Sequence, residues 1–122
     1  MDQTFEVLLK GHRNTLFIGI SGVVGNEELH LLENVLLEIE KTIDKNTFVF
    51  DFSRLEEISI VAISVIVLMQ IEARKRGQVH TIAPSNELKT VFINSGAVRE
   101  TELMPIQKFD FLNANSKNKA VV

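Results

Sequence analysis

The stretch from Phe48 to Arg76 constrains the fold more than any other part of this chain. It opens with residues 47–52, in which apolar residues follow one another with almost no alternation. Such a pattern is typical of a strand that is buried on both faces, as in a parallel sheet. The acidic segment at residues 53–57 is expected to form an exposed turn. An apolar run from Ile58 to Ile71 follows, so a strand, a turn and a second buried element are predicted in succession.

The apolar run favours two structures, because its many β-branched residues locally favour a strand. A strand rarely exceeds about ten residues, whereas this segment continues without a break to Arg76 and Gly77. Basic residues followed by glycine are typical of a helix C-terminus. The sequence therefore predicts a helix from about Ile60 to Arg76, buried over most of its circumference. The run is too short to cross a bilayer, which takes about 20 residues.

The chain before this stretch is predicted to form a hairpin and a helix. Two β-prone segments, residues 5–9 and 16–20, flank a turn at residues 11–14, which favours an antiparallel pair. Residues 21–25 are expected to be a flexible connection. An amphipathic helix is then predicted from about Glu27 to Ile43, with Asn26 as its N-cap. Its apolar stripe consists of Leu29, Leu32, Leu36, Ile39 and Ile43.

The chain after this stretch is predicted to add shorter elements. Residues 79–83 form a strand, and Ser85 caps a helix that ends at Gly96. Residues 101–104 are expected to form a last short strand, and residues 106–114 one more helix. The predicted fold is α/β: a mixed sheet with an N-terminal antiparallel hairpin and about four helices, packed mainly on one side. Residues 1–122 form one domain with a core at about 5–113 and a flexible tail at 114–122.

Composition excludes several classes of function. The net charge of −3 does not favour nucleic acid, which needs a basic patch. The chain has no cysteine and no N-terminal signal pattern, which fits a cytoplasmic protein. Its three histidines, His12, His30 and His80, lack metal-ligand spacing. No phosphate-binding glycine loop or nucleophile motif occurs, so we expect neither a cofactor, a metal nor an enzyme.

The order of these segments resembles the STAS domain, a family named after sulphate transporters and anti-sigma factor antagonists. Residues 48–53 (FVFDFS) resemble the family's strand that ends in an Asp-Leu-Ser type of sequence. Residues 83–92 resemble the next strand end and helix, and residues 95–97 (SGA) resemble the Ser-Gly-Leu that closes this helix. Residues 103–106 are similar to the final short strand. The resemblance covers about residues 5–113 and implies the STAS fold.

The family's best-known motif, Asp-Ser-Ser-Gly, lies at the N-terminus of the buried helix, where a partner kinase phosphorylates a serine. Aligned by the preceding strand, this motif falls on residues 59–62 (SIVA). Ser59 then stands in place of the aspartate, Ile60 in place of the acceptor serine and Ala62 in place of the glycine. The resemblance therefore implies a domain without a hydroxyl group at the usual acceptor position.

Ser59 has two interpretations. A hydroxyl at a helix N-terminus is a candidate phospho-acceptor, because a phosphate there meets free backbone amides. Glu56 and Glu57 oppose this, since they repel a dianion. The alternative is that Ser59 only caps the helix. Two further serines are expected to be structural: Ser53 in a turn bonded to its own backbone, and Ser64 bonded to a helix carbonyl.

Ile60 and Val61 also have two interpretations. On the exposed first turn they form an apolar spot beside the acidic pair Glu56 and Glu57, and apolar patches rimmed by charge often mark partner surfaces. Alternatively, both side chains point into the core. The predicted partner-binding surface consists of Glu56, Glu57, Ser59, Ile60 and Val61.

Three functions follow from these observations. The resemblance implies a regulatory module of the anti-sigma factor antagonist type, which binds a histidine-kinase-like anti-sigma factor or serine kinase. The alternative that the resemblance implies is an ATPase-binding subunit of an ABC transporter, such as a lipid-transport system, which suits the missing acceptor. A small enzyme or ligand carrier is the third hypothesis, although no site supports it. A homodimer is left open by the sequence.

Overall fold

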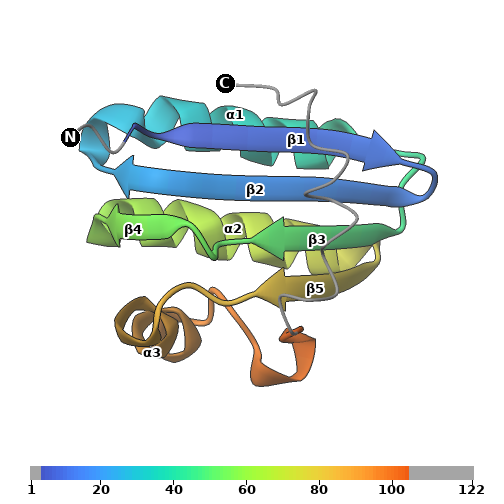
Figure 1. Ribbon diagram of the computed structural model, residues 1–122. Helices are drawn as coiled ribbons and strands as arrows, with labels where there is room; N and C mark the ends of the chain where they lie inside the picture. The colour runs from blue at the N-terminus through green and yellow to red at the C-terminus, as the bar shows by residue number, and fades with distance from the viewer. Residues whose placement is uncertain (1–3, 105–122) are drawn as a thin grey trace.

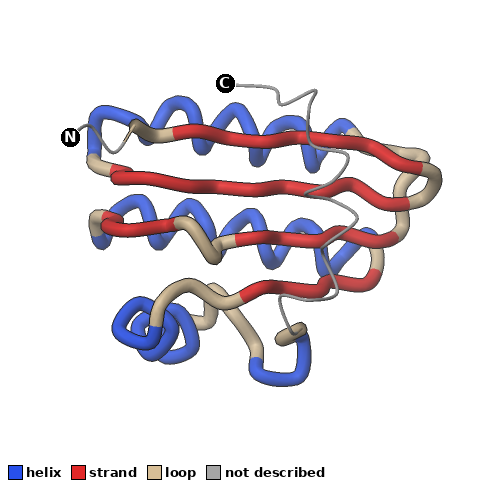
Figure 2. Tube along the Cα trace, viewed as in Figure 1, coloured by secondary structure: helices blue, strands red, loops and turns tan. Residues whose placement is uncertain are grey.

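The computed structural model describes residues 4–104 as one mixed β-sheet with helices on one of its faces. Figures 1 and 2 show α1 and α2 side by side behind the sheet, and α3 beyond the β5 edge. The strands are β1 (Glu6–His12), β2 (Thr15–Val24), β3 (Thr47–Asp51), β4 (Leu55–Ile58) and β5 (Gln78–Ile82). The helices are α1 (Leu29–Lys41), α2 (Ile60–Arg76) and α3 (Asn86–Ser95), with 3₁₀ turns η1 (Asn26–Glu28) and η2 (Glu100–Glu102).

The sheet confirms the predicted antiparallel hairpin followed by parallel pairing. Its main order is β1-β2-β3-β5, and only β1 and β2 run antiparallel. Strand β3 is buried on both faces, as predicted: Phe48 and Phe50 face the helices, whereas Val49 packs against Phe17 and Ile82 on the other face. The helix-side core continues through Phe52, whose ring lies edge-on to that of Phe92, with centroids 5.2 Å apart.

Strand β4 is the main difference from the sequence prediction. Residues 21–25 were expected to form a flexible connection and residues 53–57 a turn. The structure instead extends β2 to Val24 and pairs it with β4 in parallel, with a register shift between Gly22 and Val23. The reason is that β2 is longer than β3, so its last backbone groups need partners of their own. Only Ser53 and Arg54 remain as a turn.

Helix α2 begins and ends where the sequence predicts, but it is less buried than expected. Ser59 is its N-cap and Gly77 its C-cap. The buried side chains of α2 are Ala62, Ile63, Val65, Ile66, Met69, Gln70 and Ala73. The sheet and the flanking helices cover only this side, and several large apolar residues remain exposed on the other. Within residues 4–104, no helix is both long enough and apolar enough to span a membrane.

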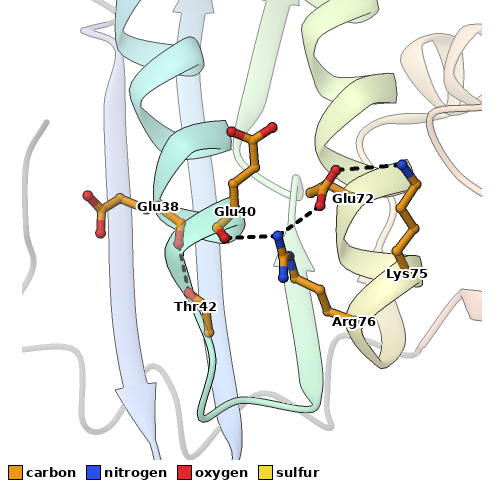
Figure 3. Close-up of polar contacts among 6 residues, drawn as sticks. All are labelled: Glu38, Glu40, Thr42, Glu72, Lys75 and Arg76. Atoms are coloured by element: carbon orange, nitrogen blue, oxygen red, sulfur yellow. Dashed lines mark hydrogen bonds and ion pairs between the residues drawn. The ribbon is translucent and has the colours of Figure 1, made fainter.

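Helix α1 is shorter at both ends than predicted. Residues 26–28 form a 3₁₀ turn, so Asn26 does not cap α1, and the Glu28 carboxylate accepts from the Gly25 amide at 2.8 Å. Ile43 lies beyond the helix and is 94% exposed, so its place in the predicted apolar stripe was wrong. At the C-terminal end, the Thr42 hydroxyl donates to the Glu38 carbonyl at 2.7 Å (Figure 3).

The C-terminal ends of α1 and α2 are tied together by one arginine. Arg76 donates to the Glu40 carbonyl on α1 at 2.8 Å and pairs with Glu72 on its own helix at 2.9 Å (Figure 3). Lys75 lies 3.9 Å from the same Glu72 carboxylate. Because both C-terminal ends meet here and the helices lie side by side, α1 and α2 run in the same direction.

The end of the described chain confirms one prediction and corrects another. Gly96 ends α3 with a φ of 85°, as a left-handed C-cap requires. Residues 101–104 do not form the predicted strand: they enter η2 and then a single parallel bridge between Leu103 and Thr81. The predicted helix at 106–114 and tail at 114–122 lie outside the described residues.

Gly22, which lies in the β2–β4 pairing, should not tolerate a larger residue. It has a φ of +87°, and a Cβ there would clash with the backbone carbonyl of Thr4. Gly96 has a similar φ but nothing within 4 Å of the same position. We predict that Gly96→Ala lowers the free energy of unfolding by about 1 kcal/mol, the cost of left-handed backbone. Gly22→Ala should cost at least about 2 kcal/mol, because the clash is added. Urea denaturation measures both, and equal losses would contradict the prediction.

Candidate partner-binding surface

The start of α2 is positioned by a tight turn after β3. The Asp51 carboxylate accepts hydrogen bonds from the Ser53 amide at 2.9 Å and from the Ser53 hydroxyl at 2.6 Å. This is the pattern of an Asx-turn. Ser53 is therefore a turn residue as expected, but it bonds the side chain of Asp51 rather than its own backbone. The Leu55 amide closes the turn by donating to the Phe52 carbonyl at 3.0 Å.

Strand β4 then carries the chain along β2 to the helix. The Gly22 amide donates to the Arg54 carbonyl at 3.0 Å, and the Ser59 amide donates to the Val24 carbonyl at 2.9 Å. Both ends of β4 are thus held on β2, so the first residue of α2 starts from a fixed point. The acidic segment, which looks irregular in the sequence, is therefore held in place on β2 and fixes the start of α2.

Ser59 caps α2, as one of its two interpretations predicts. Its Oγ accepts from the Ala62 amide at 3.1 Å, while its carbonyl accepts from the Ile63 amide at 3.0 Å. Ser59 itself is half-buried. The cap therefore uses the hydroxyl oxygen that a phosphoryl group would have to take. Its role as a phospho-acceptor stays a prediction.

Ile60 and Val61 lie on the surface, so the core interpretation was wrong. Ile60 is 83% exposed and Val61 is 51% exposed, whereas the next two residues, Ala62 and Ile63, are buried. The first turn of α2 thus presents two apolar side chains outward and two inward. The complete burial of Ala62 leaves room for only a small side chain at the position that the resemblance aligns with glycine.

The acidic residues are exposed but do not all share a face with Ile60. Glu56 and Glu57 are both exposed and have no ion-pair partner among residues 4–104. Ile58 packs on the helix-side core. Because neighbouring strand positions point to opposite faces, Glu57 points away from the helices. The predicted surface therefore keeps Ser59, Ile60 and Val61 together at the start of α2, whereas Glu57 faces the other side of the sheet.

The exposed apolar side of α2 continues beyond the first turn, which sequence reasoning missed. Leu68 is 52% exposed and Ile71 is 41% exposed. We call the residues Ile60, Val61, Ser64, Leu68 and Ile71 the outer stripe of α2. The Ser64 hydroxyl, expected to bond a helix carbonyl, lies 3.5 Å from the Ile60 carbonyl. Ile60, Ser64, Leu68 and Ile71 are spaced four, four and three residues apart, which places them on one side of a helix. The sequence did not reveal that this side is exposed, because the opposite side of α2 is apolar as well.

The other predicted polar groups do not assemble. The three histidines lie on β1, α1 and β5, and no group of three His, Cys, Asp or Glu residues that could hold a metal ion occurs in the described chain. An open groove of about 500 Å³ separates α2 from α3 and is lined by Val67, Ile71, Ile93 and Val98. Of the charged residues that line it, Arg74 is paired with Glu102 through two hydrogen bonds of 2.8 and 2.9 Å, whereas Arg99 and Glu100 are exposed.

Solved structures that are similar to this chain include three of anti-sigma factor antagonists. One is the Bacillus cell-fate determinant SpoIIAA in its phosphorylated form, with 19% identity, a TM-score of 0.66 and coverage of 91% of this chain and 98% of that one. Unphosphorylated SpoIIAA is 17% identical, with a TM-score of 0.65 and coverage of 91% of this chain and 97% of that one. An anti-sigma factor antagonist from Mycobacterium paratuberculosis is 16% identical, with a TM-score of 0.69 and coverage of 93% of this chain and 96% of that one.

The chain has the STAS fold. The mixed sheet, the hairpin and the helix layer were all predicted from the sequence, although three α-helices rather than about four lie within the described residues. Neither a family model nor a curated protein matches the sequence. At these identities the STAS neighbours establish the fold alone, so function has to be argued from the surface.

The cap predicts a specific loss of stability. We expect Ser59→Ala to lower the free energy of unfolding by about 1 kcal/mol, because the Ala62 amide loses its acceptor. Ser64→Ala is the matched control: Ser64 is exposed in mid-helix, and alanine has the higher helix propensity, so stability should stay equal or rise slightly. Thermal or urea unfolding of both variants checks this. Similar losses in the two would show that Ser59 has no special capping role.

Proposed function

We propose that this STAS domain is a non-enzymatic regulatory module that binds a histidine-kinase-like ATPase through the first turn of α2. The single observation that carries the proposal is the exposure of Ile60, at 83%, beside half-exposed Val61. An isoleucine so exposed contributes little to the core. On a partner it can be fully desolvated, where apolar anchors supply most binding energy.

The anchoring of the first turn supports the same proposal. Ser59 is fixed by its amide bond to β2 and by its capping bond to Ala62. Ile60 and Val61 are therefore presented from a rigid backbone, so little conformational entropy is lost when a partner binds. Glu56 is exposed and has no ion-pair partner in the described chain, and it precedes this turn closely in sequence, which favours a partner with basic residues near an apolar pocket.

Phosphorylation is not part of the proposed mechanism. Ile60 has no hydroxyl and stands where the resemblance places the acceptor. Ser59 has one, but its oxygen serves as the helix cap, and Glu56 and Glu57 precede it closely. We propose that the module binds its partner without a phosphorylation switch. We place it in the cytoplasm, because a chain without cysteine has no disulfide bonds that would require an oxidising compartment.

A second function, an ATPase-binding subunit of a transporter, is favoured by the same missing hydroxyl. A STAS subunit that only supports an ATPase needs the binding surface but not the acceptor. The identity of the bound ATPase separates the two. Affinity purification with the full chain should retrieve a sigma-regulating kinase in the first case and a transporter ATPase in the second. A small molecule that stays bound through purification, with no ATPase, would contradict both.

The central prediction concerns Ile60. We expect Ile60→Asp to weaken binding of the identified ATPase at least about tenfold, because a charge would be buried at the apolar centre of the interface. The fold should persist, since aspartate in a first helical turn suits the helix dipole. Ile43→Asp replaces a 94% exposed isoleucine outside the surface and should bind normally. Isothermal titration and circular dichroism measure both properties; unchanged binding by Ile60→Asp would refute the surface.

A separate prediction addresses the switch. Incubation of the full chain with its kinase partner and ATP should leave Ser59 unmodified by mass spectrometry, because its oxygen is engaged and two carboxylates lie close in sequence. Stoichiometric phosphorylation of Ser59, or dissociation of the partner when Ser59 is phosphorylated, would contradict constitutive binding and indicate a switch at that residue.

A further inference from the structure

The face of the sheet opposite the helices has an apolar centre. Phe17 on β2, Val49 on β3 and Ile82 on β5 form a cluster there, which we call the sheet cluster, and they are only 4%, 6% and 4% exposed. Figures 1 and 2 show α1 and α2 behind the sheet and α3 beyond its β5 edge, so no helix of the described chain lies over this cluster. A sheet face that meets water normally carries polar residues. The burial of the sheet cluster therefore requires a cover on this face.

The described residues cover the sheet cluster only at its margins. Leu8 and Met104 are the partly buried apolar residues that pack against it. Leu8 belongs to β1, whereas Met104 is bonded to β5, so the two lie at opposite sides of a sheet whose order is β1-β2-β3-β5. Val49 lies between them on β3. A further apolar segment is needed to keep water from the middle of the cluster.

The last described residues lie beside this cluster. The Met104 amide donates to the Thr81 carbonyl on β5 at 2.9 Å, directly after the parallel bridge between Leu103 and Thr81. Leu103 packs on the helix-side core, whereas Met104 packs on the sheet cluster. Pro105 comes next and has no amide hydrogen, so it cannot continue the pairing along β5. The pairing therefore stops at a residue whose side chain already faces the cluster.

Residues 105–113 (PIQKFDFLN) have the composition and the length of such a segment. Ile106, Phe109 and Leu112 share one side of a helix, whereas Phe109 and Phe111 share one side of a strand. Phe109 is therefore on the apolar side in either conformation. Strand β2 lies two strand spacings from β5, or about 10 Å across the sheet. Nine residues span about 13 Å as a helix and about 30 Å when extended, so both conformations reach it.

Charges around the sheet cluster suit the same segment. Lys10 on β1 and Asp51 on β3 lie on the cluster side of the sheet, because each is directly opposite a cluster residue in its strand register. Within the segment, Lys108 and Asp110 flank Phe109. The segment thus carries one charge of each sign, as the surroundings of the cluster do, so each charge has an opposite one to approach.

We infer that residues 105–113 fold back over the face of the sheet opposite the helices and cover Phe17, Val49 and Ile82. The segment docks within its own chain and completes a second, smaller core on that face. Residues 1–3 (MDQ) do not suit this role, because they hold a single apolar side chain. The docking is independent of the proposed ATPase binding, which uses the first turn of α2 on the helix side of the sheet.

Nuclear magnetic resonance of the full wild-type chain tests the contact directly. We expect nuclear Overhauser contacts between the ring protons of Phe109 and the methyl groups of Val49 and Ile82. An isotope-filtered experiment on a mixture of labelled and unlabelled chains should show that these contacts arise within one molecule. The absence of contacts between residues 105–113 and the sheet cluster would overturn the docking. Contacts that occur only between molecules would also overturn it and would assign this face to a second copy.

Thiol labelling measures how well the segment covers the face, since the chain has no native cysteine. In the full chain, Val49→Cys should react with a maleimide at least about tenfold more slowly than Thr90→Cys, which is exposed on α3. Adding Phe109→Asp should raise the labelling rate of Val49→Cys at least about tenfold, because a charge is disfavoured in an apolar contact. Val121→Asp is the matched control outside the segment and should leave the rate unchanged.

A buried site on the other side of the sheet separates uncovering from unfolding. Val35 on α1 is fully buried in the helix-side core, so Val35→Cys should stay slow to label when Phe109→Asp is added. Equal labelling of Val49→Cys and Thr90→Cys would show a bare face, and slow labelling that Phe109→Asp leaves unchanged would show a different cover. Either result overturns the docking. If Phe109→Asp accelerates both buried sites, the variant is unfolded and the Overhauser contacts of the wild type decide.

Discussion

The length of β2 is the constraint on which the candidate surface depends. This ten-residue strand pairs with β1 over Thr15 to Ser21, with β3 over its first half and with β4 over its last three residues. Without β4, backbone groups of Gly22 to Val24 would be left unpaired close to the core, at a cost of several kcal/mol. The pairing that satisfies them also fixes Ser59, and therefore the direction in which α2 leaves the sheet.

The same constraint separates what the sequence predicts from what it conceals. Strand β3 and helix α2 were predictable because each is a continuous pattern with clear ends: an unalternating apolar segment, and a run closed by Arg76 and Gly77. Strand β4 was not, because Leu55-Glu56-Glu57-Ile58 has only four residues and its pairing partner lies more than thirty positions away. Local acidity indicated a turn, and long-range backbone pairing overrode it.

The candidate site shows a similar division. The cap at Ser59 follows from a local preference of helix N-termini, and it was predictable. The exposure of Ile60 and Val61 was left open, because a β-branched apolar run gives no sign of which side faces solvent. Burial on α2 is decided by what the sheet, α1 and α3 cover, and these contacts are set by topology. For the same reason Glu57, four positions from Val61, points to the opposite side of the sheet.

The exposed side of α2 is difficult to explain by stability alone. An amphipathic pattern, with apolar residues on one side of the helix only, would have given α2 an equally good core with a charged outer face. Helix α1 has such a face, with Glu33 and Glu40 exposed. Instead, α2 is apolar on both sides, and its outer stripe keeps large side chains in contact with water. Full burial of such a side chain is worth about 1.5 to 3 kcal/mol, and the monomer realises only part of this, since these side chains are 41% to 83% exposed. Neighbouring exposed apolar side chains of this kind are typical of an interaction site, so the pattern of α2 argues for binding beyond the first turn of the helix.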